Sequence, residues 1–168
     1  MEAKARLYTL NYDEVKTYLL AMLFVACNLA LPQVFHLIPQ GGIMFAPLSL
    51  VILAGAYKFG WRVGLLAAIA SPIVNHLLTG QPAWGVLQVM TLKLVLLTLI
   101  AGLTAQYFKK VTLLPLIGVV LTAELLGGLG ELALTGGIAA TVQDFTIGYP
   151  GLILQVIGTY LLCKTSLF

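Results

Sequence analysis

The sequence predicts an all-α integral membrane protein, a bundle of six transmembrane helices with both termini in the cytoplasm. Hydrophobic residues make up 60% of the 168 residues and charged residues only 9%, whereas a soluble domain has about 25% charged residues. The apolar residues fall into successive runs, and about 20 residues at about 1.5 Å rise cross the hydrocarbon layer. Apart from Lys93, the basic residues lie near the two ends of the chain or at alternate connections between these runs.

We expect one membrane domain covering residues 1–168. The predicted spans are about 15–32, 43–57, 61–79, 84–107, 112–134 and 147–163. The formal charge of +3 is small and does not indicate nucleic-acid binding. Residues 1–16 mix acidic and basic side chains, so we expect no signal peptide there.

The first two runs are bounded by helix-start and helix-breaking residues. Polar residues at 11–14 favour a helix start before the run 15–32, and Pro32 is expected to end that helix. Pro39 and the pair Gly41-Gly42 predict a loop over 33–42. Pro47 predicts a kink in the short run 43–57.

Small and charged residues distinguish the remaining runs. Gly60-x-x-x-Gly64 at the start of 61–79 permits close helix packing. The run 112–134 holds glycines at 127, 128 and 130, which leave its backbone open to a neighbour. A Gly- and Thr-rich stretch at 135–146 predicts a loop before the last run, 147–163.

The distribution of lysine and arginine predicts the topology. Eight of the nine basic residues lie around the start of the first run, at the connection between runs two and three, between runs four and five, or after run six. Cytoplasmic loops retain such residues, and an even number of spans places all four positions on one side. The ninth basic residue is Lys93, about 14 Å into the run 84–107.

Lys93 therefore needs a partner or water, because a lysine at this depth costs at least about 2.5–3.5 kcal/mol to insert. Glu124 lies at a similar depth in the fifth run, so we expect Lys93 to pair with Glu124. Glu131, seven residues further on, shares that helix face and would be free to meet a ligand. A Lys93–Glu124 pair that only fixes helix register is the structural alternative.

Other polar side chains are expected on the outer side and point to an outward-opening pocket. The candidate substrate-binding residues are Glu131, Lys93, Gln88, Trp84, Asn75, His76, Tyr149, Gln155 and His36. Four of them have structural alternatives: Trp84 as an interfacial anchor, His76 as a helix-end residue, His36 as a loop packing residue, and Glu131 as a solvated side chain near the outer interface. The interior charges of Lys93, Glu124 and Glu131 sum to one negative charge, which favours a cationic or neutral polar solute.

Six short spans and the segment FHLIPQGGIMFAPLSL resemble the substrate-binding S components of energy-coupling factor (ECF) vitamin transporters. The resemblance implies a vitamin or precursor as ligand, a membrane scaffold subunit and two ATPases as partners, and a prokaryotic inner membrane as location. It implies a lid containing Phe35, Ile38, Gln40 and Gly41, and a docking motif at Ala26 and Ala30. The chain itself is then a transport subunit and not an enzyme, without a cofactor or metal.

Two other functions remain open from the residues alone. The first is a small intramembrane enzyme or ion-coupled carrier that uses the Lys93, Glu124 and Glu131 interior, or a site gathered from His36, His76, Glu131 and Asp144. The second is a scaffold protein without a ligand.

Overall fold

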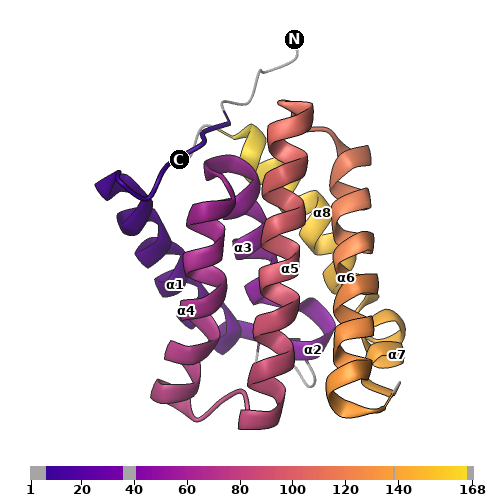
Figure 1. Ribbon diagram of the computed structural model, residues 1–168. Coiled ribbons are helices and arrows are strands. Elements are labelled where there is room, and N and C mark those ends of the chain that lie inside the picture. Colours follow the sequence, from indigo (N-terminus) through magenta and orange to yellow (C-terminus); the bar gives the residue numbers. More distant parts are fainter. Residues whose placement is uncertain (1–6, 36–40, 138, 166–168) are drawn as a thin grey trace.

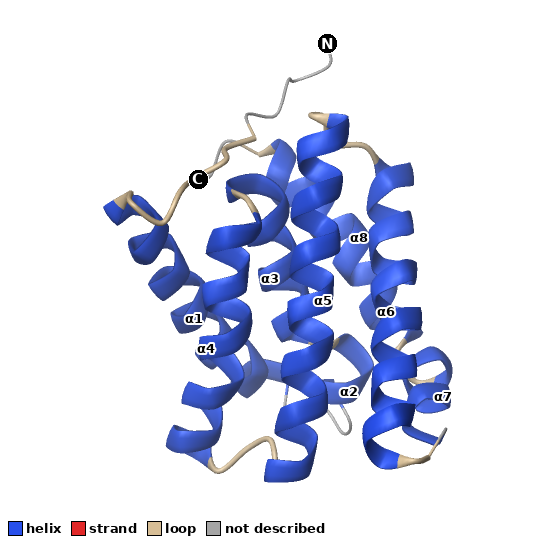
Figure 2. Cartoon of the chain, viewed as in Figure 1, coloured by secondary structure: helices blue, strands red, loops and turns tan. Residues whose placement is uncertain are grey.

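Helices form all the regular secondary structure of the described residues, 7–35, 41–137 and 139–165, in the computed structural model (Figures 1 and 2). The predicted all-α class is therefore confirmed for these residues. In chain order the helices are α1 (Val15–Phe35), α2 (Gly41–Phe45), α3 (Pro47–Phe59), α4 (Trp61–Thr79), α5 (Trp84–Phe108), α6 (Leu113–Thr135), α7 (Ala139–Thr146) and α8 (Tyr149–Lys164).

The short helix α3 lies at the centre of the bundle, where it packs against α1, α4, α5 and α8. Its sequence, PLSLVILAGAYKF, is apolar on nearly every side, and 11 of its 13 residues are buried. A helix with this pattern is stable where other helices surround it. Thirteen residues reach only about 20 Å, so α3 is shorter than the hydrocarbon layer.

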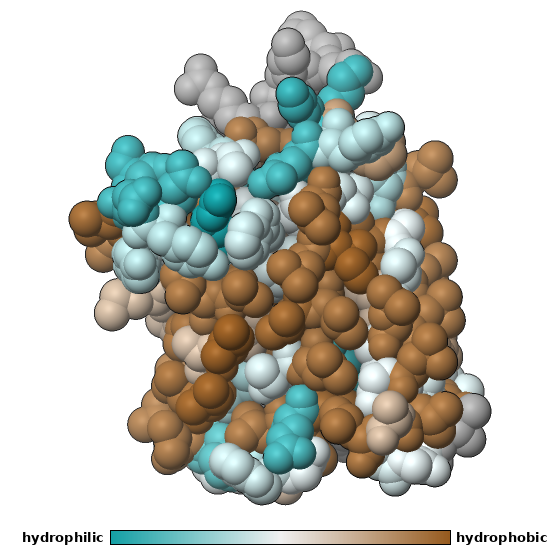
Figure 3. Space-filling model, in the orientation of Figure 1, coloured by the Kyte–Doolittle hydropathy of each residue, from teal (hydrophilic) through white to brown (hydrophobic). Residues whose placement is uncertain are grey.

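Among the described residues, four helices are long and apolar enough to cross a membrane: Val15–Val34 within α1, and α4, α5 and α6. Their outer faces are lined with exposed leucines, such as Leu103, Leu114 and Leu125. Hydrophobic residues form a band across the middle of the face in Figure 3, with hydrophilic residues gathered above it and a smaller group below. These features are those of a multi-pass membrane protein.

Helix α1 does not end at Pro32, as the sequence predicted, but continues to Phe35. Pro32 has no N–H to donate to the carbonyl of Asn28 four residues earlier. The side-chain amide of Asn75 in α4 donates to that carbonyl instead, at 3.3 Å. Asn28 in turn donates to the hydroxyl of Ser71 at 2.9 Å, so a polar network between α1 and α4 compensates for the proline.

The predicted kink in the second run is a complete break between two helices. Ala46, between α2 and α3, has a left-handed backbone with φ of 40°, and Pro47 begins α3. The backbone of α2 is close to α8, since a Cβ at Gly151 would lie 2.8 Å from the carbonyl oxygen of Met44. Gly151 thus lets α8 approach the irregular segment closely.

The other boundaries differ from the prediction mainly at one place. Helix α4 has the predicted bounds, and α5 and α6 match theirs within a residue. The stretch 135–146, predicted as a loop, contains the helix α7. That prediction was wrong because glycines at 136 and 137 mark only the turn after α6, where Gly136 has φ of 69°.

Both ends of the described chain lie at the same end of the bundle, uppermost in Figure 1. Lys58 at the end of α3 donates to the carbonyls of Leu162 and Thr165 at 3.4 and 3.2 Å. The carbonyl of Lys58 accepts from the backbone N–H of Tyr8 at 2.7 Å. A positive charge on the last carbonyls of α8 is favourable for the helix dipole, so Lys58 stabilises this junction.

Candidate functional site

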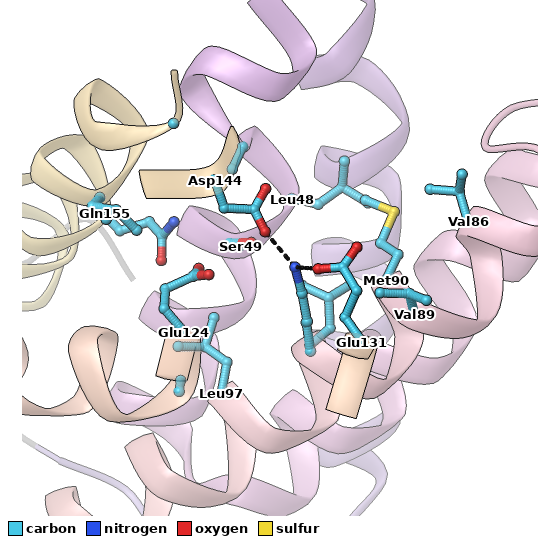
Figure 4. A pocket seen from close by; sticks show the side chains of 16 residues that line it. Leu48, Ser49, Val86, Val89, Met90, Leu97, Glu124, Glu131, Asp144 and Gln155 are labelled. Atoms are coloured by element: carbon cyan, nitrogen blue, oxygen red, sulfur yellow. Dashed lines mark hydrogen bonds and ion pairs between the residues drawn. The ribbon is translucent and has the colours of Figure 1, made fainter. Parts of the chain in front are cut away.

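Lys93 of α5 lies between two carboxylates. Its ammonium group donates to Glu131 of α6 at 2.5 Å and also to Asp144 of α7 (Figure 4). The Glu131 side chain is 9% exposed, and those of Lys93 and Asp144 are 21% and 33% exposed. The predicted pair between Lys93 and Glu124 is therefore wrong, and Glu131 is not the free acid.

The direction of helical side chains explains this choice of partner. Side chains lean toward the N-terminus of their own helix, and α5 and α6 run in opposite directions (Figure 1). Lys93 therefore leans toward the end where α6 finishes, while Glu131 leans back to meet it. Gly127 leaves room between them, because a Cβ there would lie 2.8 Å from Cγ of Lys93. The expectation that the glycines at 127, 128 and 130 leave the backbone of α6 open to neighbouring side chains is confirmed.

Helix α7 brings the third charged group to the site. Thr141 of α7 donates to the carbonyl of Gly128 at 3.3 Å and to Glu131 at 3.4 Å. Gly128 permits this contact, since a Cβ there would lie 2.5 Å from the Thr141 methyl group. Two links, from Thr141 and from Asp144 one turn later, thus hold α7 against α6 and α5.

Lys93, Glu131 and Asp144 border a cavity of about 230 Å³. Five helices supply its walls: α3, α5, α6, α7 and α8. The walls are mainly apolar, formed by side chains such as Leu48, Val86, Val89, Met90, Leu94, Leu97 and Leu152. The polar and charged side chains at its border are Ser49, Lys93, Glu124, Glu131, Asp144 and Gln155.

Two of these polar side chains have no partner in the described part of the chain. Gln155 is fully buried, and neither its amide nitrogen nor its amide oxygen makes a hydrogen bond there. The Glu124 carboxylate, which is partly buried, likewise forms no hydrogen bond or ion pair within residues 7–35, 41–137 and 139–165. Figure 4 shows the ends of Gln155 and Glu124 directed into the same part of the cavity, from α8 and α6.

The cavity ends against a packed apolar core. Leu97 and Ala123 border the cavity and also belong to this core. The core continues toward the end of the bundle that carries the chain termini, through buried residues that include Leu53, Ala56, Tyr57, Ala101, Ala105, Leu116, Val119 and Val120. The cavity is therefore blocked on the side of the termini by close-packed side chains.

Three of the predicted substrate-binding residues, Lys93, Glu131 and Gln155, border the cavity. Asn75 instead binds the backbone of α1. His76, Trp84 and Gln88 border a separate, apolar recess between α4 and α5, where the His76 ring lies 5.6 Å from the Trp84 ring and its Nδ1 lies 2.8 Å from the Pro82 carbonyl oxygen.

The remaining predicted residues lie at the surface or outside the described residues. Tyr149 is 57% exposed and does not border the cavity. His36 and the predicted lid residues Ile38 and Gln40 lie outside the described residues. Of the other lid and docking residues, Phe35 ends α1, Gly41 begins α2 and is buried, and Ala26 and Ala30 are exposed on α1.

Sequence reasoning named Asp144 only in an alternative site with His36, His76 and Glu131 and missed its contact with Lys93, and it did not single out Ser49. The lean of helical side chains was the signal that would have separated Glu124 from Lys93. Within the residues that the structure describes, no group of three His, Cys, Asp or Glu side chains is arranged to hold a metal ion.

No protein-family model, curated protein or solved structure matches the chain.

Proposed function

We propose that this protein is the substrate-binding subunit of an ATP-driven importer for a vitamin or related micronutrient. In this proposal the chain crosses a prokaryotic inner membrane six times with both termini in the cytoplasm, and the cavity takes the solute from outside. The observation that carries the proposal is a cavity with polar groups at its border and a packed apolar core on the side of the chain termini.

The shape of the cavity favours capture over conduction. Apolar walls with a few convergent polar groups are typical of small-molecule sites, and 230 Å³ suits a small solute. A channel needs polar lining along its whole length, whereas the core beyond Leu97 and Ala123 is apolar. In this proposal, delivery inward occurs by a movement of the whole subunit that a partner drives.

The charges support the orientation. Lys58, Arg62, Lys109, Lys110 and Lys164 lie in or beside connections at the end that carries the chain termini (Figure 1). Basic residues remain on the cytoplasmic side, so the opposite end, with the cavity and α7, faces outward.

The proposed partners are an ECF-type scaffold subunit and two cytoplasmic ATPases. Ala26 and Ala30 are exposed on α1 and spaced four residues apart on one helix face. Small residues in this arrangement let a second membrane helix approach closely. This supports α1 as the surface that meets the scaffold.

An ion-coupled carrier is the second candidate, because three carboxylates and one lysine gather at the cavity. Ionisable groups inside a membrane protein often mark ion or proton pathways. The two functions differ in their energy source. A carrier transports solute alone in liposomes under an ion gradient, whereas a binding subunit transports only with its ATPases.

Native mass spectrometry of the purified protein, together with affinity purification from its own host, tests the main proposal. We expect one small molecule retained per chain and co-purification of a membrane scaffold with two ATPases. Ala26→Leu with Ala30→Leu should abolish co-purification and keep the retained molecule, while Ala133→Leu on the exposed face of α6 should change neither. A protein that retains no molecule and no partner would refute the proposal.

A further inference from the structure

We propose that the cavity selects a small, flat organic cation that carries N–H donors, and that Glu124 and Gln155 bind those donors. The inference rests on the proposed function, since it names the substrate class of the same site. It differs from the sequence-based expectation, in which Glu131 met the ligand, because Glu131 already binds Lys93.

The first argument is the state of the two residues. Gln155 is fully buried with both amide atoms unpartnered among the described residues, and leaving buried polar groups without hydrogen bonds is unfavourable. Its amide points into the cavity together with the Glu124 carboxylate (Figure 4). A ligand that fills this space would satisfy both groups at once.

The second argument is the sign of the charge. Lys93 is the single cation at the cavity, against the carboxylates of Glu124, Glu131 and Asp144, so the ionised groups sum to −2. Lys93 is bound by Glu131 and Asp144, which leaves Glu124 without a cation. A positively charged ligand supplies the missing charge, while a carboxylate or phosphate would be repelled.

The third argument is the form of the donors. A carboxylate accepts hydrogen bonds only, and an amide both accepts and donates. A group with two or more N–H donors on one edge, such as an amidinium or a protonated amino-heterocycle, can donate to Glu124 and to the Gln155 oxygen together. The leucine, valine and methionine side chains of the walls then contact the flat body of the ligand.

Three molecules of nearly the same shape and different charge test the proposal: benzamidinium (+1), benzamide (0) and benzoate (−1). Binding to the purified full-length protein is measured by isothermal titration calorimetry in neutral detergent at pH 7. We expect benzamidinium to bind about tenfold or more tightly than benzamide, and benzoate to bind weakest. Equal binding of the three, tighter binding of benzoate, or binding of none would overturn the proposal.

Two variants assign the preference to Glu124. Glu124→Gln keeps the size of the side chain and should reduce the preference for benzamidinium over benzamide to about twofold or less. Asp13→Asn makes the same charge change at an exposed position outside the cavity and should keep the full preference. If Glu124→Gln retains the preference in a protein whose melting curve is unchanged, Glu124 is not the receptor and the inference fails.

Failure here can be separated from failure of the proposed function. A protein that retains a neutral or anionic vitamin and co-purifies with ATPases, yet shows no preference for benzamidinium, overturns the substrate class and supports the importer. A protein that prefers benzamidinium but has no partner and transports alone supports the substrate class and refutes the importer.

Discussion

Replacing Gln155 with leucine should make the protein more stable and its binding weaker. Leucine fills a similar space without polar atoms, so the variant removes a buried amide that has two unpartnered atoms among the described residues. A buried polar group without a hydrogen bond costs about 1–3 kcal/mol, and we count the two atoms of the Gln155 amide as one such group. We therefore expect the free energy of unfolding to rise by about 1–3 kcal/mol, with a melting temperature about 2–4 °C higher for each kcal/mol.

Cys163 provides the assay for this variant. Its thiol is buried in α8, so a maleimide that fluoresces on reaction reports unfolding, in a Cys27→Ala background that removes the half-buried second thiol. Thr159→Val is the matched control. The Thr159 hydroxyl is also buried and unpartnered in the described structure, but it does not border the cavity.

Gln155→Leu should therefore raise stability and weaken benzamidinium binding about tenfold, whereas Thr159→Val should raise stability and leave binding unchanged. A lower melting temperature for Gln155→Leu would refute the reasoning, because it would show that the amide stabilises the unliganded fold. Unchanged binding would refute the assignment of Gln155 to the ligand.

Three further substitutions test the packing and the ion cluster by the same melting assay. Lys93→Met leaves Glu131 and Asp144 facing each other and should lower the free energy of unfolding by about 3 kcal/mol. This is the lower end of the usual range for a broken buried ion pair, because Asp144 is partly exposed. Adding Glu131→Gln and Asp144→Asn should recover most of the lost stability, and no recovery would contradict the ion-pair explanation. Gly102→Ala should destabilise the protein by about 1–3 kcal/mol, since the new Cβ would lie 2.8 Å from the backbone of Trp61. Gly118→Ala, where a Cβ would have nothing within 4 Å, should stabilise it by about 0.5–1 kcal/mol. Equal effects of the two substitutions would argue against close packing at Gly102. Asn75→Leu should lower the free energy of unfolding by about 1 kcal/mol, because it leaves the Asn28 carbonyl unpaired. The loss should be smaller in a Pro32→Ala background, where a backbone N–H returns to that carbonyl. An identical loss of stability in both backgrounds would show that Asn75 and Pro32 are not coupled.

The helices were largely predictable because apolar runs and breaking residues act locally. The run 61–79, bounded by Gly60 and Gly80, gave both ends of α4 correctly. Pro32 misled because a proline ends a helix only when its freed carbonyl finds no other donor. The donor is Asn75, 47 residues away in sequence, and no local pattern shows that contact.

The site was predictable in its location and less so in its pairing. Composition and depth indicated that Lys93 needs carboxylate partners, and one of its two partners, Glu131, was already a candidate. Depth alone could not choose between Glu124 and Glu131, because the lean of each side chain along its helix decides which pair meets. Asp144 was hidden by the loop-like composition before α7.

The junction at Lys58 has a consequence for rearranging the chain. Tyr8 and Thr165, near the two ends, both bind this one residue, and the hydroxyl of the adjacent Tyr57 donates to the carbonyl of Lys110 at 3.0 Å. In a circular permutant, a short peptide would join the present termini and new termini would be made after Lys110. The joining peptide and the new termini would therefore lie at the same end of the bundle. Such a circular permutant keeps the direction of every helix in the bundle, so it should fold with the cavity intact.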